Sequence, residues 1–209
     1  MSLKNKKILI TAGPTWVAID KVRVISNLAT GETGWILADK FKRLGARVTL
    51  LLGPGDFSGR LAGIRLVRFK YFSQLARLLE MELNKGYAGL VHAAAVADYQ
   101  PKHIFSGKVS SKKKDWKLEL VPTKKLIRKI KPAYPGLFTV GFKFEPEAAK
   151  SKLLKEGAAL LSSAKLDLVV ANSNKNNGYQ AYILGERKVY GPYLSKNKMA
   201  AGLSGLMEN

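Results

Sequence analysis

Two glycine clusters near the start of the chain contain residue types suited to phosphate binding. Gly13-Pro14 follows an apolar stretch, and Thr30-Gly31-Glu32-Thr33-Gly34 precedes a segment with helical spacing. Glycine lets the backbone approach a ligand closely, and the free N–H groups at a helix N-terminus bind anions. Each cluster could instead be a plain turn or helix N-cap, and neither the dinucleotide motif G-x-G-x-x-G nor the P-loop motif is present. We favour phosphate binding by the second cluster.

Polar residues lie between these clusters and again after a later apolar stretch. Arg23 and Asn27 occupy the first loop, and Arg23 offers a planar fork that matches phosphate or carboxylate, although an exposed arginine can be merely solvated. Ala93-Ala94-Ala95 precede Asp98, whose carboxylate could orient a hydroxyl or amide or hold a metal-bound phosphate. The alanines leave room for a ligand or for a crossing helix, and we interpret His92 as a core residue.

The elements that must position these residues alternate along the chain. Expected strands cover residues 7–12, 47–53, 64–69, 89–97, 138–144 and 167–172. Expected helices cover residues 35–44, 71–85, 123–134, 147–164 and 193–206, and a hairpin of 181–184 with 188–190 precedes the last of them. Apolar strands separated by helices predict an α/β fold with a doubly wound, mostly parallel Rossmann-like sheet. Ligands of such sheets bind at the carboxyl ends of the strands.

The formal net charge of +21 is concentrated in one part of the chain. Residues 102–131 hold eleven Lys or Arg against Asp115 and Glu119. We expect a basic flap at about 99–121 within a single domain over 1–209, with strand-like alternation at 116–121. Nucleic-acid binding is one interpretation, but no row of stacking aromatics accompanies the lysines. A cleft for small polyanions needs the same positive field, so we do not expect a nucleic-acid partner.

Composition excludes several other classes of site. The chain has no cysteine and only His92 and His103, which excludes disulfides and thiolate sites and disfavours a histidine metal site. We therefore name no metal-ligating residue. No apolar run reaches the roughly 18–20 residues that span a bilayer, and the N-terminal residues lack a signal sequence. We expect a cytoplasmic protein without a membrane partner.

Taken together, these motifs closely resemble the phosphopantothenoylcysteine synthetase family, also called phosphopantothenate–cysteine ligase. The matching segments are ITAGPT at 10–15, IDKVRVISN at 19–27, ATGETG at 29–34, AAAVADY at 93–99, GFKFE at 141–145 and LDLVVAN at 166–172. The resemblance covers nearly the whole chain and is to the stand-alone form. It implies coenzyme A synthesis: the carboxylate of 4′-phosphopantothenate attacks the α-phosphorus of CTP or ATP, and cysteine then displaces the nucleotide. It also implies Mg²⁺ on the phosphates and a homodimer whose flap closes a neighbour's site.

The resemblance also implies roles for individual residues. Lys108 would stabilise charge at the α-phosphate, and Asn27 would position the acyl-nucleotide. Implied nucleotide-binding residues are Gly13, Ala29, Thr30, Gly31, Gly34, Phe142 and Asn172. Implied substrate-binding residues are Arg23, Asn27, Ala94, Ala95 and Asp98.

Two features set limits on this interpretation. Family members commonly place lysines before the strand at 167–172, whereas residues 157–160 here read GAAL, with Lys152 and Lys155 upstream and Lys124 or Lys125 as possible substitutes. The nucleotide preference and the grip on the triphosphate therefore stay open. The rival on the same fold is another nucleotide-binding enzyme such as a dehydrogenase. Against it, the strand at 47–53 ends in Gly53-Pro54-Gly55 rather than in an acidic residue.

Overall fold

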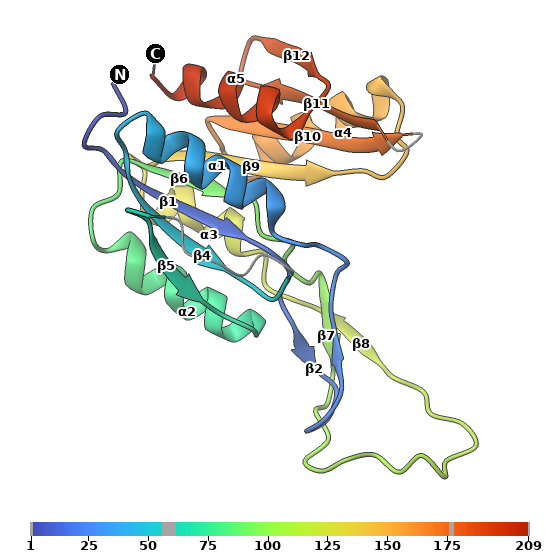
Figure 1. Cartoon of the computed structure of the whole chain (residues 1–209). Coiled ribbons are helices and arrows are strands. Elements are labelled where there is room, and N and C mark those ends of the chain that lie inside the picture. The colour runs from blue at the N-terminus through green and yellow to red at the C-terminus, as the bar shows by residue number, and fades with distance from the viewer. Residues whose placement is uncertain (1, 56–61, 176–177, 209) are drawn as a thin grey trace.

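One eight-stranded sheet forms the body of the molecule in the computed structural model, which describes residues 2–55, 62–175 and 178–208 (Figure 1). The strand order is β12-β11-β10-β9-β6-β1-β4-β5. The six strands from β10 to β5 run parallel, and β11 and β12 are antiparallel. Their bounds are β1 (Lys7–Ala12), β4 (Arg47–Leu52), β5 (Arg65–Arg68), β6 (Gly89–His92), β9 (Phe138–Phe144), β10 (Leu168–Lys175), β11 (Gly178–Leu184) and β12 (Val189–Tyr193).

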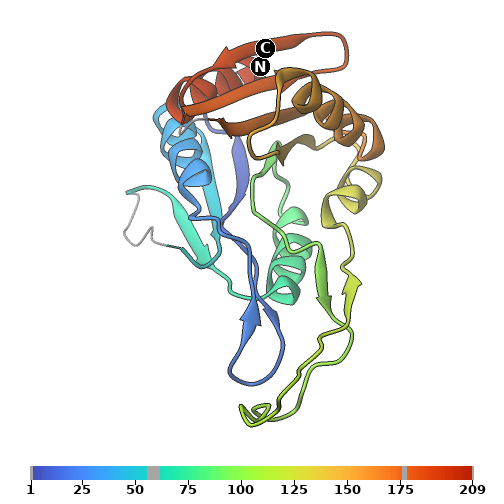
Figure 2. The same cartoon turned by 90° about the vertical axis from the view of Figure 1, so that its right-hand side faces the viewer.

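Helices cover both faces of this sheet. On one face lie α1 (Glu32–Arg43) and α5 (Lys196–Glu208), and on the other α2 (Phe72–Leu83), α3 (Leu126–Ala133) and α4 (Lys150–Ser163) (Figure 2). Alternate residues of β1 pack on opposite sides, Ile8 and Ile10 beneath α1 and α5, and Leu9 beneath α2 and α3. Burial of both faces explains the continuous apolar strands. The predicted α/β fold with a mostly parallel sheet and a C-terminal hairpin is confirmed.

Two short hairpins project from one end of this body (Figures 1 and 2). The first pairs β2 (Val17–Ala18) with β3 (Val24–Ile25), and the second pairs β7 (Tyr99–Pro101) with β8 (Leu120–Pro122). Residues 102–119, between β7 and β8, contain no helix or strand and correspond to most of the expected flap. In the part of the chain that is described, no helix is both long enough and apolar enough to cross a membrane.

Several element boundaries differ from those expected. The strand expected at 89–97 ends at His92, because the alanines that follow leave the ladder and Ala95 pairs with the chain after β1 instead. The alternating segment at 116–121 pairs only from Leu120 onward. The helix expected at 123–134 begins at Leu126, because Thr123 bonds to the carbonyl groups of Ala97 and Asp98. The helix expected at 35–44 begins earlier, at Glu32.

Candidate active site

The two glycine clusters meet at the carboxyl end of β1. Gly13 and Gly31 both adopt left-handed backbone conformations, with φ of 77° and 88°, and Gly31 is the N-cap residue of α1. A Cβ atom on Gly34 would lie 2.2 Å from the Cβ of Ala12, so the first turn of α1 lies directly against the strand. The N–H groups of that turn, of which that of Glu32 donates to Thr30 Oγ1 at 3.3 Å, therefore lie at the edge where such sheets bind ligands.

A cavity of about 370 Å³ lies beside this helix start. It is lined by Pro14, Asn27, Leu28, Ala29, Thr30, Pro54 and Gly55. The loop after β4 forms one wall at close range, because a Cβ on Gly53 would lie 2.2 Å from the carbonyl oxygen of Pro14 and one on Gly55 would lie 2.2 Å from that of Thr30. Sequence reasoning missed this wall, although a Gly-Pro-Gly run ending a parallel strand was the signal for it.

Asn27 joins the first loop to the predicted small-residue segment. Its Nδ2 donates to the carbonyl oxygen of Ala95 at 3.1 Å and lies 3.5 Å from that of Val96. Ala95 in turn donates its N–H to the carbonyl oxygen of Gly13 at 2.9 Å. Three of the predicted site residues are thus directly connected by hydrogen bonds.

A buried pair of side chains supports the same segment from below. His92 Nδ1 lies 2.8 Å from Thr11 Oγ1, and Thr11 Oγ1 accepts the N–H of Ala94 at 3.3 Å. Burial lowers the pKa of His92 to about 4, so the ring is neutral at physiological pH and shares one hydrogen bond with the Thr11 hydroxyl. His92 is therefore a buried residue that supports Ala94 from the core through Thr11, as expected for a core residue.

Asp20 locks the β2–β3 hairpin to the flap. Its side chain is fully buried and accepts the N–H groups of Val22, Arg23 and Val109 at 2.8, 2.7 and 3.1 Å. Arg23 Nη1 adds an ion pair at 2.7 Å and also donates to the Val109 carbonyl at 3.1 Å. Burial alone would raise the pKa of Asp20, but these hydrogen bonds and the charge of Arg23 lower it to about 2. Sequence reasoning had assigned Asp20 no role.

Lys108 lies next to this clamp, between Gly107 and the clamped Val109. Its side chain is exposed, and no carboxylate among the described residues lies within ion-pair distance of it. It does not line the 370 Å³ cavity. Within one chain, the structure therefore does not bring Lys108 together with the glycine clusters.

The remaining predicted residues lie around the same sheet edge. Phe142 and Asn172 are half-buried on the neighbouring strands β9 and β10. Asp98 forms an ion pair of 2.5 Å with Lys125, one of the two lysines considered as substitutes. Both side chains of that pair are half or more exposed, so it contributes little stability.

Two further ion pairs affect the charge that is available for binding a triphosphate. Lys152 of α4 pairs at 2.9 Å with Glu145, a carboxylate that it shares with Lys143. At the start of α1, Glu32 would repel a bound phosphate, but Lys196 of α5 forms an ion pair with it. The sequence separation of 164 residues hid this second pair from sequence reasoning. Among the described residues, no group of three or more His, Cys, Asp or Glu could hold a metal ion.

Comparison with known proteins shows which family the chain belongs to. The family model described as DNA/pantothenate metabolism flavoprotein C-terminal domain matches residues 3–203. The coenzyme A biosynthesis bifunctional protein CoaBC of Thermococcus kodakarensis is 34% identical over 178 residues, 85% of this chain and 43% of that protein. Its counterpart from Borreliella burgdorferi is 32% identical over 204 residues, 95% and 51% of the two chains. The chain thus spans about half the length of these curated relatives.

Solved structures share the fold. The DNA/pantothenate metabolism flavoprotein from Streptococcus pneumoniae superposes with a TM-score of 0.87 at 23% identity, covering 97% of this chain and 98% of its own. A Cab2 mutant in complex with phosphopantothenate-cysteine gives a TM-score of 0.79 at 19% identity, covering 98% and 87%. The family match extends over nearly all of the chain, and the chain belongs to the DNA/pantothenate metabolism flavoprotein C-terminal domain family.

Proposed function

We propose that this chain is a phosphopantothenate–cysteine ligase of coenzyme A synthesis, with residues 1–209 acting as one domain. The observation that carries the proposal is the family match over residues 3–203, which includes both glycine clusters that meet beside the cavity. The relatives named above are coenzyme A biosynthesis proteins, and a structural neighbour was crystallised with phosphopantothenate-cysteine. An acid–amine ligase must first convert a carboxylate into an acyl group with a good leaving group.

In the first proposed step, the carboxylate of 4′-phosphopantothenate attacks the α-phosphorus of CTP or ATP. An acyl-nucleotide forms and pyrophosphate leaves. The nucleotide would lie along the helix start, with Phe142 against the base and Asn172 nearby. The phosphates would be held by Gly13, Ala29, Thr30, Gly31 and Gly34. Mg²⁺ would arrive with the triphosphate and neutralise its oxygens, because hard cations of this kind prefer phosphate oxygens to an all-protein cage.

In the second proposed step, the amine of cysteine attacks the acyl carbon. The amide bond forms and the nucleoside monophosphate leaves. Asn27 would position the acyl-nucleotide, because its amide is held in place by Ala95. The substrate pocket would also include Ala94 and the side chains of Arg23 and Asp98. Arg23 uses only Nη1 for Asp20 and Val109, which leaves the rest of its fork for a substrate oxygen.

The isolated position of Lys108 supports a dimer. Because Lys108 lies outside the cavity of its own chain, we propose a homodimer in which the flap of one protomer closes the site of its partner. Lys108 would there stabilise the charge that develops at the α-phosphate. The cytoplasm is the proposed location, because it supplies the nucleoside triphosphate.

Substitution of Lys108 tests this role directly. We expect Lys108→Gln to slow pyrophosphate release by about 100-fold or more, as removal of one such electrostatic contact does in other enzymes. Lys113→Gln, a neighbouring exposed lysine of the same flap, serves as the matched control and should retain wild-type turnover. Near-normal turnover of Lys108→Gln would remove Lys108 from the mechanism.

Co-expression of two inactive variants tests whether the flap acts across the dimer. In a mixed dimer of Lys108→Gln and Asn27→Asp chains, one site regains both native residues if the flap crosses to the partner. Random pairing then restores amide formation at about a quarter of all sites. If the flap acts within its own chain, each site of the mixed dimer carries one of the two substitutions, and no product forms.

A further inference from the structure

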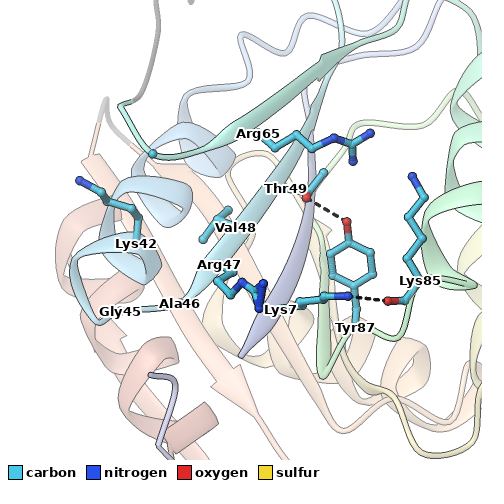
Figure 3. Close-up of a pocket in the computed structure, with 11 residues that line it drawn as sticks. Lys7, Lys42, Gly45, Ala46, Arg47, Val48, Thr49, Arg65, Lys85 and Tyr87 are labelled. Atoms are coloured by element: carbon cyan, nitrogen blue, oxygen red, sulfur yellow. Dashed lines mark hydrogen bonds between the residues drawn. The ribbon is translucent and has the colours of Figure 1, made fainter. Parts of the chain in front are cut away.

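A second hollow lies at the opposite edge of the sheet from the candidate active site (Figure 3). It has a volume of about 700 Å³, within the range of roughly 300–1,000 Å³ that holds small ligands. Its lining includes five cations, Lys7, Lys42, Arg47, Arg65 and Lys85. Lys7, Arg47 and Arg65 are the first residues of β1, β4 and β5, so this is the amino-terminal edge of the parallel strands.

Three of these cations lie close together at the starts of adjacent strands. Lys7 and Arg47 are register partners on adjacent strands, and Arg65 is the partner of Thr49, two residues beyond Arg47. Neighbouring strands are roughly 5 Å apart and residues two apart share a face, so these three cations point to the same side of the sheet. Figure 3 shows them with Lys85 around one opening. Like charges in directly opposed positions destabilise a sheet, so an anion bound between Lys7 and Arg47 would relieve their repulsion.

One buried carboxylate offsets part of this charge. Glu82 of α2 pairs with Arg65 and Lys85, each at 2.8 Å, and accepts the Tyr87 hydroxyl at 2.7 Å. Burial would raise the pKa of Glu82, but hydrogen bonds from Arg65, Lys85 and Tyr87 lower it to about 2, so it stays ionised. The five cations that line the hollow therefore retain a net charge of +4.

The other cations of the hollow have no such partner. Lys7 donates to the backbone carbonyl of Lys85 at 2.9 Å. Within the described ranges, no carboxylate lies within ion-pair distance of Lys7, Lys42 or Arg47. The planar fork of Arg47 is thus free for bidentate contacts, which match phosphate oxygens.

We propose that this hollow is a second anion site, which binds a small molecule carrying two or more phosphate groups. Concave walls focus a positive field, and the free fork of Arg47 beside Lys7 supplies charge-assisted donors. The ligand occupies the amino-terminal edge, so it does not compete for the carboxyl edge where the cavity beside α1 lies.

The test is a titration of isotope-labelled protein with sodium tripolyphosphate, followed through backbone amide signals. We expect the amides of Ala46 and Thr49 to shift saturably in wild-type protein. Arg47→Gln should weaken that binding about tenfold or more, since a hydrogen bond to a charged group is lost, and Arg47→Lys should retain part of it. Arg47 is exposed, so both variants should fold. The amides of Thr30 and Gly31 report separately on the active site.

The matched control removes an equal charge elsewhere. Arg187 lies in the turn between β11 and β12, at the far side of the sheet from β5, and its side chain is exposed. Arg187→Gln should leave the Ala46 and Thr49 titration unchanged. The proposal is overturned if those amides do not shift, or if both substitutions weaken binding equally. It is also overturned if a single-stranded oligonucleotide displaces tripolyphosphate from these amides at lower concentration.

Discussion

A single methyl group at Gly34 should disturb both the stability of the fold and nucleotide binding. The Cβ of Gly34→Ala would lie 2.2 Å from the Cβ of Ala12, 1.2 Å short of the 3.4 Å at which ordinary van der Waals contact begins. Overpacking costs ~1–3 kcal/mol, and we expect the upper end here because both atoms belong to regular elements. Alanine regains about 1 kcal/mol of helix propensity. The free energy of unfolding should therefore fall by about 2 kcal/mol.

This loss is measurable by thermal unfolding. About 2 kcal/mol corresponds to a fall in Tm of roughly 4–8 °C for a domain of this size. Gly205→Ala is the matched control, because Gly205 is also helical, in α5, and its Cβ would meet nothing within 4 Å. That variant should be as stable as wild type or more so. If Gly34→Ala unfolds at or above the wild-type temperature, the close packing of α1 on β1 is wrong.

The variant also tests the phosphate role of the helix start. Because α1 must move away from β1, the N–H groups of its first turn should lose their alignment. A displacement of about 1 Å can slow a reaction by about 100-fold. We expect pyrophosphate release to fall by more than the small loss of folded protein explains. Unchanged kinetics in a destabilised Gly34→Ala protein would contradict the assignment of the phosphates to α1.

Three further predictions concern the loops around the site. Asp20→Asn should loosen the clamp on Val109 and speed trypsin cleavage within residues 102–119, whereas Asp39→Asn, which affects only a surface pair with Arg43, should not; equal cleavage would contradict the clamp. The free energy of unfolding should fall by up to about 3 kcal/mol as pH drops from 6.5 to about 4. In this range His92 becomes protonated in the unfolded chain but stays neutral in the folded protein, because burial lowers its pKa from 6.5 to about 4. His92→Gln should reduce that slope in urea titrations, and an identical slope would refute it. Asn27→Asp should release pyrophosphate but stall before amide formation, and failure of an acyl-nucleotide to accumulate would exclude its role in the second step.

The sheet could be predicted because its physics is local. Apolar runs such as residues 47–52 are buried on both faces, and this pattern is visible without knowing their neighbours. Helix starts were less predictable. The start of α1 depends on the left-handed backbone of Gly31, and Gly34 inside the helix looked like part of a turn.

Contacts across long sequence separations were not predictable. Asp20 holds the flap by accepting the N–H of Val109, 89 residues away in the sequence, and this contact is visible only in the structure. Gly55 forms a cavity wall only because the carbonyl of Thr30 lies against it. Parallel-sheet topology did predict that Gly13 and the alanines after β6 meet at one edge, because the carboxyl ends of adjacent parallel strands must do so.

The most direct test of the proposed function is pyrophosphate release by purified protein. The reaction contains 4′-phosphopantothenate, cysteine and Mg²⁺, with CTP or ATP in parallel, and a second series omits phosphopantothenate. We predict release that requires phosphopantothenate, followed by amide formation once cysteine is present, and the faster nucleotide establishes the base preference. No release with either nucleotide, or release that is independent of phosphopantothenate, would contradict the assignment of this chain as a ligase.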